Sequence, residues 1–173
     1  MDLLEIIYEM IDLRSFSNLW YWISLAVLWS SASHWILGVP YDMVYRARRR
    51  GGQAEQDLED VTRANINRML YIAEVSGPWI VALACFLLSA LATLGFVYLM
   101  EIAQAVFLLL FPMSVVGLIS FFTARRIASE KAAGADLRRR LAFCRLYIQF
   151  VGTVSILVTA FWGMYQNLAI GAL

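Results

Sequence analysis

The chain has 173 residues, of which 61% are hydrophobic and 16% are charged, and its formal net charge at pH 7 is +1. A soluble domain is about 45–50% apolar and about 25% charged, so this composition indicates an integral membrane protein. The small net charge excludes a uniformly basic nucleic-acid-binding protein and an acidic disordered tail. The two cysteines, Cys85 and Cys144, lie far apart and exclude a disulfide scaffold or a cysteine-ligated metal site.

The N-terminal segment is amphipathic. Between Asp2 and Leu13, apolar residues recur at helical spacing, and four acidic residues take mostly the other face. The pattern predicts a short helix that lies in the outer membrane interface. A docking face for a periplasmic partner is the alternative interpretation.

Apolar stretches long enough to cross a bilayer follow, since a span needs about 20 mostly apolar residues for about 30 Å of hydrocarbon. The first, Asn18–Leu37, contains no Asp, Glu, Lys or Arg. The block Met69–Phe122 suits two spans, with the turn near Thr93–Gly95 or, alternatively, at Tyr98–Glu101. The four predicted spans are residues 18–37, 72–92, 97–122 and 146–167, joined within the chain by polar loops at 38–68 and 123–145.

The distribution of cations predicts the orientation of these spans. Apart from Arg14, every Lys and Arg lies in the loop 38–68 or the loop 123–145. Cytoplasmic loops are enriched in these residues because positive charge resists translocation. We therefore expect one all-α transmembrane domain over 1–173, a four-helix bundle in the inner membrane with both loops cytoplasmic and both termini periplasmic.

Local signals refine this arrangement. The stretch Gln53–Arg68 lacks Pro and Gly, so it is predicted to be helical and to run on into the second span as far as Gly77–Pro78. Pro78 and Pro112 are each expected to kink the helix that contains them. Small residues permit close helix contact, and those in the spans include Gly117, Gly152, Gly163, Ser114 and Ser155.

The sequence contains no recognisable catalytic set. A bis-histidine haem site needs two histidines, and His34 is the only one. One histidine and two scattered cysteines do not make a zinc site. Neither a GxSxG nucleophile elbow nor a GxxxxGK[ST] phosphate-binding loop occurs. We therefore expect a protein that is not an enzyme and that holds no metal and no cofactor.

Polar residues in or beside the spans are the candidate intramembrane sites: His34, Glu74, Glu101, Gln104 and Gln149. Ionisable groups inside spans are costly, so a function is their first interpretation. The alternative is that both glutamates are interfacial carboxylates, with Glu74 paired to Arg68 or Arg145, and that the histidine bonds a nearby serine or carbonyl group.

Arginine clusters at the predicted inner boundary are candidates for binding anionic lipid headgroups, at about 1 kcal/mol per residue near the surface. They are Arg46, Arg48, Arg49, Arg50, Arg125, Arg126, Arg138, Arg139 and Arg140. Aromatic residues near the span ends, such as Trp20, Trp35 and Trp162, are typical of aromatic belts. Contacts to a quinone or a carotenoid would use the same residues.

The string RSFSNLWYWISLAVLWSSASHWILGVPYDMV, followed by ARRRGGQAE, resembles a family of small polytopic inner-membrane proteins of photosynthetic and related alphaproteobacteria. The resemblance extends over the whole chain and brings no catalytic motif with it. Some members of this family carry a label as a component of a Suf iron–sulfur assembly complex. The resemblance implies an inner-membrane location and a polytopic topology.

Three functions fit these observations. The first is a non-enzymatic accessory or assembly subunit of a larger inner-membrane complex of a bioenergetic kind, respiratory or photosynthetic. Its partners would be other membrane subunits or copies of itself, together with anionic phospholipids and without nucleic acid. The alternative is a small oligomeric carrier or permease that uses Glu74, Glu101, Gln104 and Gln149. The third is a pigment- or quinone-binding membrane protein.

Overall fold

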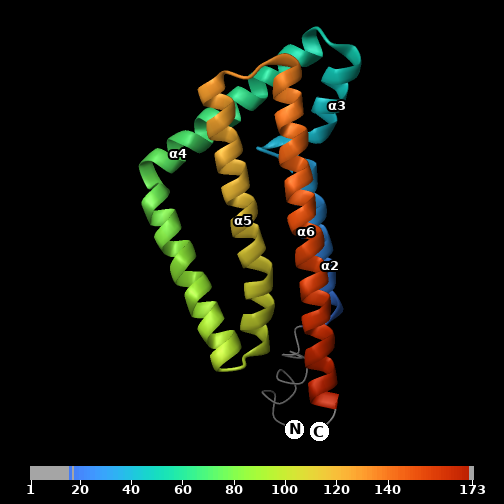
Figure 1. The fold of residues 1–173 in the computed structure, drawn as a ribbon, viewed down its shortest axis with the longest axis vertical. Helices are drawn as coiled ribbons and strands as arrows, with labels where there is room; N and C mark the ends of the chain where they lie inside the picture. Colours follow the sequence, from blue (N-terminus) through green and yellow to red (C-terminus); the bar gives the residue numbers. More distant parts are fainter. Residues whose placement is uncertain (1–15, 17, 172–173) are drawn as a thin grey trace, which may run out of the picture.

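The structure is a computed structural model that describes residue 16 and residues 18–171. The amphipathic helix predicted at Asp2–Leu13 lies outside the described residues. The described chain is mostly helical (Figure 1). Its elements in chain order are α2 (Leu19–His34), β1 (Trp35–Ile36), β2 (Val39–Pro40), α3 (Tyr41–Arg50), α4 (Gln53–Ala92), the π-helix η1 (Thr93–Val97), α5 (Glu101–Glu130) and α6 (Gly134–Gly171).

The long helices lie side by side (Figure 1). α5 packs between α4 and α6, and α2 packs against α6. α3 and the amino-terminal part of α4 contact each other at the end of the molecule opposite the start of α2. α4 with η1, α5, and α6 up to Leu168 are each long and apolar enough to cross a membrane. The start of α2 and the end of α6 lie at one end of the molecule, and the arginine-rich segments lie at the other end (Figure 1).

The prediction for the first span, 18–37, is wrong at its carboxyl end, because α2 stops at His34. β1 and β2 pair antiparallel, and Leu37 and Gly38 form the turn between them with φ angles of 53° and 73°. Two successive positive φ angles suit a two-residue hairpin turn, and glycine adopts them without a steric cost. A short apolar run does not by itself distinguish the end of a helix from a buried hairpin.

The two predicted loops are largely helical. The helix expected over Gln53–Arg68 is confirmed, and α4 continues beyond Pro78 to Ala92, bending partway along its length (Figure 1). Between α5 and α6 only residues 131–133 are not helical, because Lys131 ends α5 in the left-handed region with a φ of 48°. The turn after α4 and η1 lies at residues 98–100, the second of the two positions that the sequence left open.

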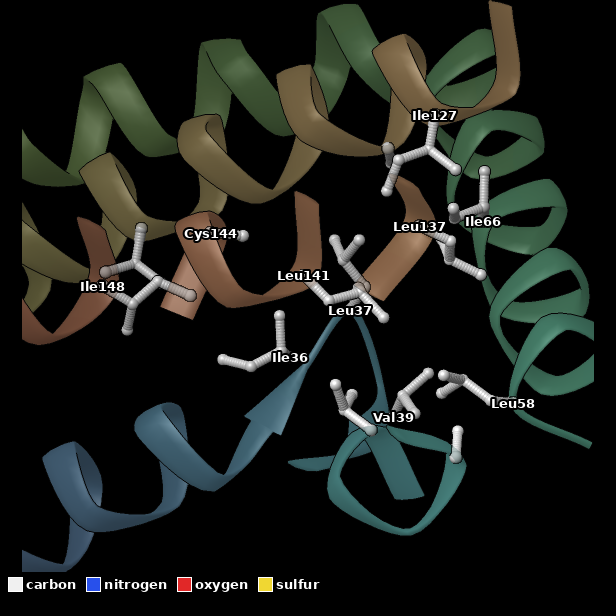
Figure 2. Close-up of a cluster of buried hydrophobic side chains, with 14 of the residues drawn as sticks. Ile36, Leu37, Val39, Leu58, Ile66, Ile127, Leu137, Leu141, Cys144 and Ile148 are labelled. Carbon is white, nitrogen blue, oxygen red and sulfur yellow. The ribbon is translucent and has the colours of Figure 1, made fainter. Parts of the chain in front are cut away.

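The main hydrophobic core lies where the hairpin meets α4, α5 and α6 (Figure 2). Each aliphatic side chain fully buried there contributes about 2 kcal/mol. The hairpin places three side chains among those of the helices, so it packs between their ends and contributes to one shared core. The labelled residues are Ile36, Leu37, Val39, Leu58, Ile66, Ile127, Leu137, Leu141, Cys144 and Ile148.

Close helix contacts occur at two of the three predicted glycines. A Cβ added to Gly152 would lie 2.7 Å from Cε3 of Trp29, and one added to Gly163 would lie 3.3 Å from Phe16. At Gly117 an added Cβ would meet no neighbouring element of the described chain within 4 Å, so that position makes no close helix contact within the described chain and a contact with a partner subunit stays a prediction. The face of α6 that carries Gly152 and Gly163 therefore packs against α2 and against Phe16, which precedes it.

Candidate functional site

The first candidate site is a buried cluster of hydrogen bonds around Gln104, whose side chain is completely buried. Its Nε2 donates to the Gly95 carbonyl oxygen at 2.7 Å. Its Oε1 accepts hydrogen bonds from Trp162 Nε1, at 3.0 Å, and from Gln166 Nε2. We call these four residues the glutamine junction. They connect η1, α5 and the end of α6.

The glutamine junction depends on close packing between η1 and α5. A Cβ added to Gly95 would lie 3.0 Å from both Cγ and the backbone nitrogen of Gln104, so a larger residue would separate the two elements. A glutamine amide supplies both donors and an acceptor, and here it satisfies a carbonyl on one element and two donors on another. The junction is therefore a satisfied polar network inside an apolar molecule, which is costly to disrupt.

Glu101 ties the start of α2 to the start of α5. Its Oε1 accepts a hydrogen bond from the Phe16 backbone N–H at 2.8 Å, and the Phe16 carbonyl accepts one from Trp22 Nε1 at 3.0 Å. The Tyr21 hydroxyl donates to the Ala105 carbonyl at 3.3 Å. Glu101 also lies in the first turn of α5, where a negative charge interacts favourably with the positive end of the helix dipole.

The other predicted intramembrane residues lie elsewhere. Glu74, Gln149 and His34 are exposed, and His34 makes an edge-on contact with the Trp35 ring at 5.9 Å between centroids. Of the five candidates, the structure brings only Glu101 and Gln104 into one region. A single polar path lined by all four carrier residues is therefore absent from the described chain.

The predicted pairing of Glu74 with Arg68 or Arg145 is wrong. Within the described residues, Glu74 makes no hydrogen bond or ion pair. Arg145 is held instead by α2 and α3: its Nε donates to the Ser33 carbonyl at 3.2 Å, and its guanidinium lies 3.9 Å from the centroid of the Tyr41 ring. The sequence spacing alone does not reveal these long-range partners.

The second candidate site, which we call the arginine end, comprises α3, the first part of α4, the end of α5 and the start of α6. The structure divides the predicted lipid-binding arginines into two groups. Those ion-paired to carboxylates of this chain are Arg46 with Asp42, Arg126 with Glu130, Arg138 with Glu55, and Arg140 with Asp136 and Glu130. Those without an ion pair to any described residue are Arg48, Arg49, Arg50, Arg125 and Arg139. The second group retains its charge for an external anion.

Carboxylates of α4 connect the arginine end across the chain. Glu55 pairs with Arg138, and the Glu59 Oε1 accepts a hydrogen bond from the Gly134 backbone N–H at 2.6 Å. At the end of α5, beyond the predicted span, hydrogen bonds from Arg126 and then Arg140 hold the pKa of Glu130 below its usual range. Glu55 and Glu59 therefore hold the start of α6 against α4.

The cavities among the described residues differ in size. Among the described residues, no group of His, Cys, Asp or Glu side chains is arranged to hold a metal ion. An apolar cavity of about 230 Å³ lies between α5 and α6 beside Pro112 and Ser155. Ligand pockets usually enclose about 300–1,000 Å³, so this cavity is small for one. Two other cavities fall within that range: one of about 370 Å³ beside Ile66 and Ile127, and one of about 400 Å³ between α2 and α6.

The sequence does not identify three residues of the glutamine junction as a site. It predicts Gly95 only as part of a turn and Trp162 only as part of an aromatic belt, and it does not single out Gln166. The spacing of Trp162 and Gln166 was the available signal, because residues four apart project from the same face of a helix. Nothing in the sequence indicates that Gln104 faces this pair.

Comparison with known proteins finds no protein-family model, no curated protein and no solved structure that matches this chain. The functional interpretation therefore depends on the residues and geometry described above.

Proposed function

We propose that the protein is a non-enzymatic accessory or assembly subunit of a larger complex in the bacterial inner membrane. In this proposal α2, α4, α5 and α6 span the bilayer, the arginine end is cytoplasmic, and both termini are periplasmic. At 1.5 Å per residue, the 16 residues of α2 extend about 24 Å, slightly less than the hydrocarbon thickness.

The observation that carries the proposal is an uncovered apolar stripe on α4. Of its most apolar 18-residue window only 6% is buried, against 17% for α5 and 28% for α6. A helix that is hydrophobic and uncovered needs lipid or another protein around it. Large side chains recur every three or four residues along one face, and we call this set the α4 stripe: Tyr71, Val75, Trp79, Leu83 and Phe86.

The chemistry of the α4 stripe favours a protein partner. Trp79 is 80% exposed and Phe86 is 69% exposed, and both lie well inside the helix rather than at its ends. Large aromatic side chains are enriched at protein–protein interfaces because each buries a wide area with little loss of conformational entropy. We infer that a membrane helix of another subunit, or of a second copy, packs on this stripe.

The glutamine junction supports a structural role over transport. A carrier needs polar groups that exchange partners with a substrate, whereas every hydrogen-bonding atom of the Gln104 amide except one N–H is engaged within the chain. If the carrier alternative were correct, Glu74→Gln with Glu101→Gln would abolish flux in reconstituted vesicles and leave the assembly state unchanged. The accessory role predicts a change in assembly or no change.

A photo-crosslinking residue placed at Trp79 in the native membrane tests the proposal directly. We expect a defined crosslinked protein band from this position. The matched control is the same residue at Leu157, an exposed position on α6, from which we expect no such band. Migration of the mild-detergent extract as a free monomer on a native gel, together with equal crosslinking from both positions, would overturn the proposal.

A further inference from the structure

Arg145 has no counter-ion in the described part of the chain. Among the described arginines, those that are half-buried rather than exposed are Arg138, Arg140 and Arg145. Arg138 and Arg140 each pair with a carboxylate, whereas Arg145 makes no ion pair with any described residue. Moving a charge out of water is costly unless an opposite charge accompanies it, so this position calls for an anion from outside the described chain.

The guanidinium of Arg145 is held in place and retains free donors. Its Nε donates a hydrogen bond to the Ser33 carbonyl oxygen, and the flat face of the guanidinium lies over the Tyr41 ring. The two terminal nitrogens make no hydrogen bond to any described residue. A fixed guanidinium with both terminal nitrogens available can bind a phosphate group through two parallel hydrogen bonds.

A groove begins beside this arginine. A cavity of about 400 Å³ lies between α2 and α6, and Ser33, which bonds Arg145, is one of its lining residues. On α6 the lining runs from Ile148 to Ile156, so the groove begins three residues after Arg145 and follows one face of the helix for about 12 Å. Its volume falls within the usual range for a ligand site, and we call it the α2–α6 groove.

The wall of the groove contains an unsatisfied donor. Trp29 lines the cavity, is only 6% exposed, and its Nε1 has no hydrogen-bond partner among the described residues. Its ring is fixed by contact with Gly152, where an added Cβ would lie 2.7 Å from Cε3. A buried indole N–H normally has a partner, so an acceptor oxygen of a ligand in the groove would remove this deficit.

We propose that the α2–α6 groove binds one anionic phospholipid, with its phosphate on Arg145, an ester oxygen near Trp29 and an acyl chain along α6 toward Ile156. The inference rests on the proposed transmembrane arrangement, in which Arg145 lies at the inner boundary and the groove lies within the hydrocarbon. A free phosphate ion would satisfy the arginine, but it would leave the rest of the groove, including its end at Ile156, empty. This site differs from the surface clusters because it binds a single lipid in a defined place.

Native mass spectrometry of the full chain in mild detergent, titrated with dioleoylphosphatidylglycerol, tests the proposal. We expect one tightly retained lipid and a loss of affinity of about tenfold or more in Arg145→Gln, because a charge-assisted contact is removed. The matched control is Arg125→Gln, which removes an exposed arginine without an ion pair and should change the affinity less than about twofold. Equal losses in the two variants, or no loss in Arg145→Gln, would overturn the proposal in favour of diffuse surface attraction.

A second pair of variants keeps the test independent of the charge. Ile156→Trp fills the apolar end of the groove and should displace the lipid, whereas Leu157→Trp on the neighbouring exposed face should not. If Arg145→Gln fails to fold, this pair decides the outcome. Retention of the lipid in Ile156→Trp would overturn the proposal.

Two further titrations identify the source of the anion. Dioleoylphosphatidylcholine should not replace the anionic lipid, and inorganic phosphate should not displace it. Displacement by phosphate would identify an anion site without lipid specificity, and equal binding of both lipids would remove the role of net charge; either result overturns the proposal. A chain that retains the lipid and still migrates as a free monomer would refute the accessory function alone.

Discussion

The two halves of α4 belong to one continuous helix but have opposite relations to the rest of the chain. In the first half, Leu58, Thr62 and Ile66 are buried at a spacing of four residues, and Glu55 and Glu59 bond the start of α6. In the second half, no residue of the helix is buried, and the α4 stripe is open along its whole length.

The difference shows where the stability of this molecule arises. The amphipathic half has a clear inner face, so it folds onto its own chain and contributes to the core in Figure 2. The apolar half has only half-buried side chains on the face that packs on α5, and the α4 stripe on its other side is left for lipid or a partner. Matched substitutions in packed and open positions therefore test whether this contrast governs stability across the molecule.

The largest expected effect separates the two halves of α4 directly. Leu58→Ala removes a completely buried side chain and should lower the free energy of unfolding by about 2–5 kcal/mol. Leu83→Ala removes the same group from a position that is 58% exposed and should change it by less than about 0.5 kcal/mol. Chemical denaturation in detergent micelles measures both, and similar losses would remove the contrast.

Alanine substitutions at one glycine of α6 and one of α5 extend the comparison, and they should change the stability in opposite directions. Gly152→Ala forces a Cβ against the Trp29 ring and should destabilise the protein by about 1–3 kcal/mol. Gly117→Ala meets no neighbouring element of the described chain within 4 Å and should stabilise the protein by about 0.5–1 kcal/mol, because alanine has the higher helix propensity. Thermal unfolding followed by circular dichroism distinguishes the two, and a destabilised Gly117→Ala would mean that α5 has a contact on that face.

The glutamine junction provides a polar version of the same comparison. Gln104→Leu leaves the Gly95 carbonyl and the Trp162 Nε1 without their partner and should cost about 1–3 kcal/mol. Gln149→Leu changes an exposed amide and should cost less than about 0.5 kcal/mol. Unfolding free energies of the two variants check this prediction, and an unaffected Gln104→Leu would show that the junction does not hold the helices together.

The smallest effect concerns ion pairs at the arginine end. Glu55→Gln breaks the partly buried pair with Arg138, whose side chains are 31% and 23% exposed, and should cost about 1 kcal/mol. Asp42→Asn breaks the pair with Arg46, whose side chains are 59% and 53% exposed, and should cost almost nothing. Unfolding at low and high salt measures both, and the Glu55→Gln loss should shrink less with salt than a surface pair would.

Much of the helical structure was predictable because apolar length and charge are local properties. The helix over Gln53–Arg68 and the close contacts at Gly152 and Gly163 were predicted correctly. The hairpin after His34 was not, since Ile36, Leu37 and Val39 are as apolar in a helix as in a buried turn. Their burial depends on α4, α5 and α6, which are distant in sequence.

The candidate sites divide in the same way. Gln104 and Glu101 were identified because polar groups are rare in spans, but their partners were not, because those lie on other elements. Likewise the sequence located the arginine clusters, while only the structure separates Arg138 and Arg140, which have carboxylate partners, from Arg145, which has none among the described residues.

The sequence by itself determined that this is a mostly helical chain suited to a membrane, because the apolar runs and the position of nearly every cation can be read residue by residue. Tertiary structure alone decided which face of each helix is covered. Burial, ion pairing and the α2–α6 groove arise between residues far apart in the chain, and their energies depend on distances that no local pattern contains.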